Sequence, residues 1–122
     1  MLRSLVGSAS WGNAVITSES ADGITVEVPV AATGSRVATV VVQGYIAAID
    51  APCIRPPKEL KTWDKFVVEP GASHAAQLEF PRSAFRRWDT ATGSWIVDAG
   101  DYEVVIAASA TDIRQRLRVT LA

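Results

Sequence analysis

Few side chains in this 122-residue sequence could do chemistry: one histidine, one cysteine and thirteen acidic residues. His74 follows the Pro70–Gly71 turn, and no nucleophile with an orienting acid stands beside it, as a catalytic histidine needs. Residues 8–12 (Ser-Ala-Ser-Trp-Gly) only approach a nucleophile elbow, because the first glycine is missing and no strand precedes them. Thirteen carboxylates always allow some pair at glycosidase spacing, and these occupy turns and outward strand positions. We therefore predict no catalytic residue in this chain.

Metal and cofactor sites are not predicted either. Cys53 is the only cysteine, so it cannot form a disulfide within the chain, and with His74 it makes no zinc-binding set. Asp89, Asp98 and Asp101 fall in or near turns, but their spacing is not that of a calcium loop. We expect no metal ion and no cofactor.

The composition indicates one globular domain with an ordinary core. Hydrophobic residues make up 48% of the chain and charged residues 20%. The net charge of −1 argues against a nucleic-acid-binding surface, and no apolar run is long enough to span a membrane. Residues 1–10 lack the apolar centre of a signal peptide, and the single cysteine favours a cytoplasmic location. Secretion remains open, since secreted proteins without disulfides exist.

Four aromatic and apolar residues are candidates for binding. Trp88 and Trp95 flank a turn with glycine at position 93, and their indoles could stack on a sugar ring. Alternatively they pack on each other and on the sandwich edge, and we favour this core packing. Leu60 and Trp63 follow a proline-rich stretch, and here an interface anchor and a first core residue of the next strand are equally supported.

A third candidate is the basic stripe formed by Arg114, Arg116 and Arg118. It could bind an acidic partner. We instead expect a solvated strand face whose arginines pair with carboxylates across the sheet, such as Asp101 and Glu103.

Alternation of apolar and polar residues is the main structural signal, and it predicts strands. It is seen over residues 24–30, 76–80, 102–106 and 113–121, while residues 40–46 are apolar on both parities and suit a central strand. Pro29 indicates that the first of these strands lies at an edge or ends there. Residues 83–87 suggest one helical turn. Glycine-containing turns separate the runs, so we predict an all-β, immunoglobulin-like antiparallel sandwich of about seven strands. Residues 1–10 would form a loosely ordered lead-in and residues 11–122 the domain.

A series of short motifs is similar to one known family. They are Val41–Val42–Gln43 with Tyr45–Ile46, Arg55–Pro56–Pro57–Lys58–Glu59–Leu60–Lys61, Pro70–Gly71 with Ser73, Trp88–Asp89 with Trp95, Gly100–Asp101–Tyr102, and Asp112–Ile113–Arg114. In this order they resemble the C-terminal fibronectin type III-like domain of family 3 glycoside hydrolases, the β-glucosidase group. Thr62 and Ala108 depart from it, because that family usually has glycine at both positions.

The resemblance implies a function without chemistry in this chain. In the family this domain accompanies catalytic domains that carry the nucleophile and the acid, and the parent enzyme hydrolyses terminal β-glycosides. We expect an accessory domain, not an enzyme, that docks on glycoside hydrolase catalytic domains in the same or a separate chain. The expected interface residues are Arg55, Pro56, Pro57, Lys58, Glu59, Leu60 and Trp63. The alternatives are a free-standing protein-interaction module and a carbohydrate-binding module that uses Trp88 and Trp95.

Overall fold

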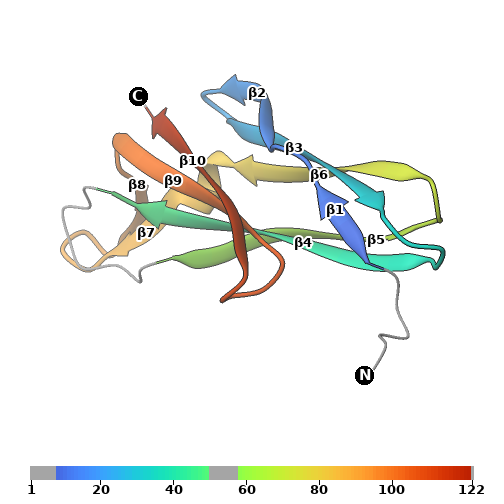
Figure 1. Cartoon of the computed structure of the whole chain (residues 1–122). Helices are drawn as coiled ribbons and strands as arrows, with labels where there is room; N and C mark the ends of the chain where they lie inside the picture. Colours follow the sequence, from blue (N-terminus) through green and yellow to red (C-terminus); the bar gives the residue numbers. More distant parts are fainter. Residues whose placement is uncertain (1–7, 50–57, 122) are drawn as a thin grey trace.

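The computed structural model describes residues 8–49 and 58–121, and most of them lie in strands (Figure 1). The strands are β1 (Ala9–Trp11), β2 (Val15–Ser20), β3 (Gly23–Ala32), β4 (Ala38–Ala48), β5 (Glu59–Val68), β6 (Ser73–Pro81), β7 (Arg86–Asp89), β8 (Ser94–Val97), β9 (Gly100–Ala107) and β10 (Ile113–Leu121). A single 3₁₀ turn, η1 (Arg82–Phe85), matches the expected helical turn. The described residues include no helix long and apolar enough to cross a membrane.

Two antiparallel four-stranded sheets form the body of the domain. In the first sheet, β3 pairs with β6 along one side and with β1 and β2 in turn along the other. The second sheet has the order β10-β9-β4-β5, so β4 is central as predicted. Strands β7 and β8 form a separate hairpin. The predicted all-β antiparallel sandwich is therefore confirmed.

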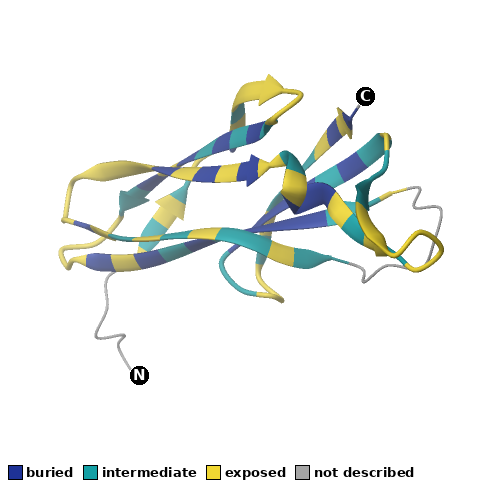
Figure 2. Cartoon of the chain, turned by 180° about the vertical axis from the view of Figure 1, so that it is seen from behind, coloured by how far each residue is buried: buried dark blue, intermediate teal, exposed yellow. Residues whose placement is uncertain are grey.

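The core lies between the two sheets and is built by the alternation seen in the sequence (Figure 2). Every second side chain of each long strand points inward, because successive residues of a strand face opposite sides of its sheet. The most deeply buried core side chains include Val26, Val28, Leu78 and Phe80 from the first sheet and Val42, Tyr102, Val104 and Ile106 from the second. No polar or charged residue of the described part is fully buried.

The start of the domain differs from prediction, while the strand count roughly agrees with it. Ten strands are present in the described residues against about seven predicted, and β1 and β2 were not predicted. Ala9 and Ser10, placed in the lead-in, belong to β1, where Ser10 lies opposite Ala31. Residues 1–7 lie outside the described part of the chain. A three-residue strand is too short for alternation to reveal it.

The prediction that Pro29 marks an edge strand was wrong. Strand β3 has neighbours on both sides, and Pro29 lies where the neighbour changes from β2 to β1. The carbonyl of Pro29 accepts a hydrogen bond from the Gly12 amide (2.7 Å) in this gap. Because the N and O of one strand residue point to the same side, the missing N–H of Pro29 faces the interruption between two strands, where no regular ladder bond is lost.

Candidate functional site

The outer face of the sheet β10-β9-β4-β5 carries exposed apolar side chains along its edge strand. On β5, Leu60, Trp63 and Val67 are 45%, 65% and 58% exposed. Trp63 lies opposite Gln43, and Leu60 lies opposite Tyr45 after a register shift. Directly paired residues of antiparallel strands point to the same side, so these three residues share the sheet face turned away from the core. We call Leu60, Trp63 and Val67 the β5 face.

A small second hydrophobic cluster continues this face across the sheet. Tyr45, Val105 and Ala107 are buried there, and Ile113 packs against them. The Tyr45 hydroxyl donates a hydrogen bond to Oε1 of Gln43 (2.7 Å), which fixes the ring in place. The apolar character therefore extends from the edge strand β5 over β4 to β9.

Charged residues at the start of β5 border this surface. The Lys58 ammonium lies 5.2 Å from the centre of the Tyr45 ring, within the range of a cation–π contact. Lys61 and Glu59 form an ion pair with an Nζ–Oε2 distance of 3.2 Å. Lys58 and Leu60, both predicted as interface residues, thus lie beside Tyr45, whereas the third, Glu59, lies opposite Ile46.

Of the two interpretations of Trp63, core packing was wrong, because its side chain is the most exposed large hydrophobic group among the described residues. Its role as an interface anchor stays a prediction, as does that of Leu60. Arg55, Pro56 and Pro57 fall outside the described residues. Val67 was missed, although its position four residues after Trp63 places it on the same parity of the strand.

Trp88 and Trp95 pair with each other but not with the core. They face each other directly in the β7–β8 ladder, with ring centres 5.4 Å apart and ring planes at 74°. The predicted packing of the two indoles on each other is thus confirmed, but their exposed fractions of 49% and 54% show that their expected burial in the core was wrong. The pair belongs to a hairpin outside both sheets, which the alternation pattern alone could not show. Sugar stacking on these indoles stays a prediction.

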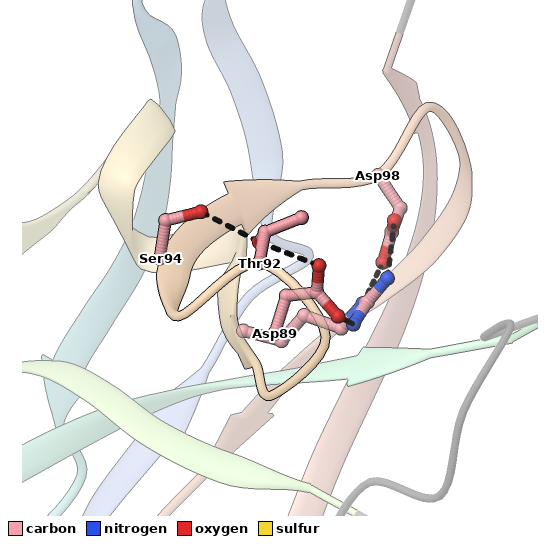
Figure 3. Close-up of polar contacts among 5 residues, drawn as sticks. Asp89, Thr92, Ser94 and Asp98 are labelled. Carbon is pink, nitrogen blue, oxygen red and sulfur yellow. Dashed lines mark hydrogen bonds and ion pairs between the residues drawn. The ribbon is translucent and has the colours of Figure 1, made fainter.

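Polar contacts fix this hairpin at both ends (Figure 3). At the base, the Arg87 guanidinium binds both carboxylate oxygens of Asp98, at 2.6 and 3.2 Å. At the tip, the Thr92 hydroxyl donates to Oδ2 of Asp89 (2.7 Å) and lies 2.8 Å from the Ser94 hydroxyl. The Thr92 hydrogen bond is the main cause that lowers the pKa of Asp89, with smaller contributions from backbone amides and Arg87. The tip needs glycine at position 93, where φ is 66°.

The basic stripe on β10 is paired as predicted. Arg116 contacts Glu103 (2.6 Å) and Arg118 contacts Asp101, each diagonally across the ladder with β9, since Arg118 lies opposite Glu103 and Thr120 lies opposite Asp101. A hydrogen bond from Thr120 and then one from Arg118 lower the pKa of Asp101. Arg114 turns to Asp112 and lies over the Trp11 ring. These arginines therefore form a solvated strand face, on which Arg116 and Arg118 have cross-strand partners.

The described residues do not assemble catalytic machinery around His74. The His74 side chain is half exposed, and the centre of its ring lies 4.2 Å from the centre of the Phe66 ring. Its Nε2 atom lies 3.9 Å from the Asp64 carboxylate. One open hollow of about 260 Å³ is lined in part by Asp22 and Glu79, but both residues are exposed. This hollow thus lacks the enclosed environment that acid–base catalysis uses. No group of three potential metal ligands occurs among the residues of the described part.

Comparisons with known proteins agree on one family. The sequence profile of the fibronectin type III-like domain matches residues 40–110. A β-glucosidase of Rhizobium radiobacter is 38% identical over 114 residues, which are 92% of this chain but 14% of that protein. A probable β-glucosidase L of Emericella nidulans is 40% identical over 90 residues, covering 74% of this chain and 12% of the relative.

Solved structures give the same result for the fold. The family 3 β-glucosidase of Bifidobacterium adolescentis superimposes with a TM-score of 0.88 at 29% identity, over 94% of this chain and 17% of that one. The β-glucosidase of Kluyveromyces marxianus gives a TM-score of 0.87 at 27% identity, over 94% and 14% of the two chains. The chain thus spans only a small part, 12–17%, of these four proteins. It belongs to the fibronectin type III-like domain family, in the form found within β-glucosidases of glycoside hydrolase family 3.

Proposed function

We propose that this chain is the non-catalytic accessory domain of a glycoside hydrolase and that it docks on the catalytic part of the same polypeptide. The parent enzyme would hydrolyse terminal β-glycosides, as the names of its relatives suggest. The observation that carries the docking role is the β5 face, an exposed apolar surface on an otherwise well-packed domain. Such surfaces commonly mark contacts with another protein body.

The relatives supply the neighbour that this surface would meet. In the Rhizobium radiobacter β-glucosidase the matching segment accounts for 14% of the chain, so a body several times larger is attached to it. Trp63 is a suitable anchor because buried tryptophans are enriched among the residues that dominate binding energy. Full burial of a large apolar side chain is worth roughly 1.5–3 kcal/mol, so the three residues of the β5 face could hold the two bodies together.

The test compares two valines with equal exposure on opposite sheets. Val67 lies on the β5 face and is 58% exposed, whereas Val15 lies on β2 and is 56% exposed. In a chimera, this chain replaces the matching segment of the Rhizobium radiobacter β-glucosidase, and the chimera is required to keep β-glucosidase activity. We expect Trp63→Ala and Val67→Ala to lower the temperature at which this activity is lost, because they remove docking contacts.

Val15→Ala is the matched control and should leave the inactivation temperature unchanged. The same three substitutions in the 122-residue chain alone should change its unfolding free energy by no more than about 0.5 kcal/mol, as is usual for surface positions. Equal inactivation temperatures for the Val67→Ala, Trp63→Ala and Val15→Ala chimeras would contradict docking through the β5 face.

A further inference from the structure

The hairpin β7–β8 is held more rigidly than a short ribbon would be by itself. A two-stranded hairpin alone is at best marginally stable in water. Here the Arg87–Asp98 pair fixes its base, and the contacts of Thr92 with Asp89 and Ser94 fix its tip (Figure 3). The Tyr102 hydroxyl also donates to the carbonyl of Asp98 (2.7 Å), which ties the base to β9 in the core. The hairpin is therefore a preorganised arm.

The side of this arm that carries the indoles is open. Trp88 and Trp95 are directly paired, so they project from the same side of the ribbon, while Arg87 and Asp89 project from the other. About half of each indole is exposed. The Arg86 guanidinium lies 4.4 Å from the centre of the Trp95 ring and completes the surface. We call Arg86, Trp88 and Trp95 the tryptophan arm.

The chemistry of the tryptophan arm suits a protein better than a sugar. The two indoles stand at 74° to each other and form no flat platform, and Arg86 already covers one face of Trp95. The groups that could bind sugar hydroxyls are the Asp89 carboxylate and the hydroxyls of Thr92 and Ser94. They are already hydrogen-bonded to one another. Tryptophan and arginine are the residues most enriched at energetic centres of protein interfaces, and a rigid arm loses little conformational entropy on binding.

The position of the arm indicates which protein it meets. The hairpin and the start of β5 lie at the same end of the sandwich in both overall views (Figures 1 and 2). Leu60 of the β5 face, near the start of β5, is therefore at the arm's end of the molecule. We propose that the tryptophan arm is a second anchor on the catalytic part of the same polypeptide. This inference rests on the proposed function and adds a second point of attachment, so that the domain is held at two points.

Oxidative footprinting tests this arm directly, because the chain has four tryptophans and they sample different surfaces. The rate of hydroxyl-radical oxidation of each indole is measured by mass spectrometry in the 122-residue chain and in the active chimera. We expect Trp88 and Trp95 to react several-fold more slowly in the chimera. Trp11 on β1, toward the other end of the sandwich, is the internal control and should react equally in both (Figure 1).

The oxidation rates of the four indoles distinguish a failure of the tryptophan-arm proposal from a failure of the proposed function. Protection of Trp63 without protection of Trp88 and Trp95 would overturn the arm and leave docking through the β5 face intact. Protection of Trp88 and Trp95 without Trp63 would support the arm and contradict the β5 face. Equal rates for all four would overturn both. Protection of Trp88 or Trp95 in the isolated chain by added cellobiose would assign the arm to sugar binding and overturn the inference.

Discussion

Replacing Phe80 with alanine should lower the free energy of unfolding of this chain by about 3–5 kcal/mol, the usual loss for a buried phenylalanine. Phe80 is fully buried on β6, in the core between the two sheets. The substitution removes the transfer free energy of the ring and leaves a cavity that the packed strands cannot close. Since domains of this size are stable by about 5–15 kcal/mol, the variant should retain little stability. Urea unfolding followed by circular dichroism measures the change.

Trp63→Ala is the control for Phe80→Ala, because it also removes an aromatic side chain from a strand. Trp63 is 65% exposed, so its loss should change the unfolding free energy of the isolated chain by no more than about 0.5 kcal/mol. The expected difference between the two substitutions comes from where the fold places the two rings. A loss of several kcal/mol for Trp63→Ala would show that this residue belongs to the core.

The second large effect is expected at Gly44 on β4. A Cβ atom at this position would lie 2.5 Å from Cζ of Phe80 and 3.1 Å from Cγ2 of Thr62. Alanine normally stabilises a strand relative to glycine by about 0.5–1 kcal/mol, whereas overpacking a core costs about 1–3 kcal/mol. We therefore expect Gly44→Ala to destabilise the chain, with the unfolding free energy measured in urea as before.

A double substitution shows whether the Phe80 ring is the cause. Phe80→Leu shortens the side chain that the new methyl group would meet, so Gly44→Ala should cost less in the Phe80→Leu background than in the natural sequence. Contacting residues usually show such coupling, with interaction energies of about 0.5–3 kcal/mol. Strictly additive effects of the two changes would mean that β4 and β6 do not face each other across the core as described.

Period-2 alternation was enough to predict the body of the fold. The inward set of β3, from Ile24 to Val30, and the inward set of β9 are both visible in the sequence, and both are buried. The burial of Phe80 follows from the same pattern in β6. What alternation could not give is the partner of each strand. Pro29 predicted a strand that lies at an edge or ends there, yet it lies inside β3, opposite the gap between the neighbouring strands β1 and β2. Only the pairing of the strands shows this gap.

The candidate surfaces were only partly predictable, because exposure depends on what the tertiary structure leaves uncovered. Tryptophan is the largest apolar side chain, and a core position was the natural expectation for Trp88 and Trp95. The separate hairpin places both outside the two sheets instead. Trp63 lies on the outward-facing side of an edge strand, where nothing in the described part of the chain covers it. Its exposure could be predicted only from the order of the strands in the sheet, which the sequence pattern does not give.

The central claim is that this chain supports a glycoside hydrolase without doing its chemistry. The most direct test adds a chromogenic aryl β-glucoside to the purified 122-residue chain and to the chimera that carries it, at equal concentrations. We predict release of the chromophore by the chimera and none above buffer by the chain alone. Turnover by the isolated chain that is retained through repeated purification would contradict this account.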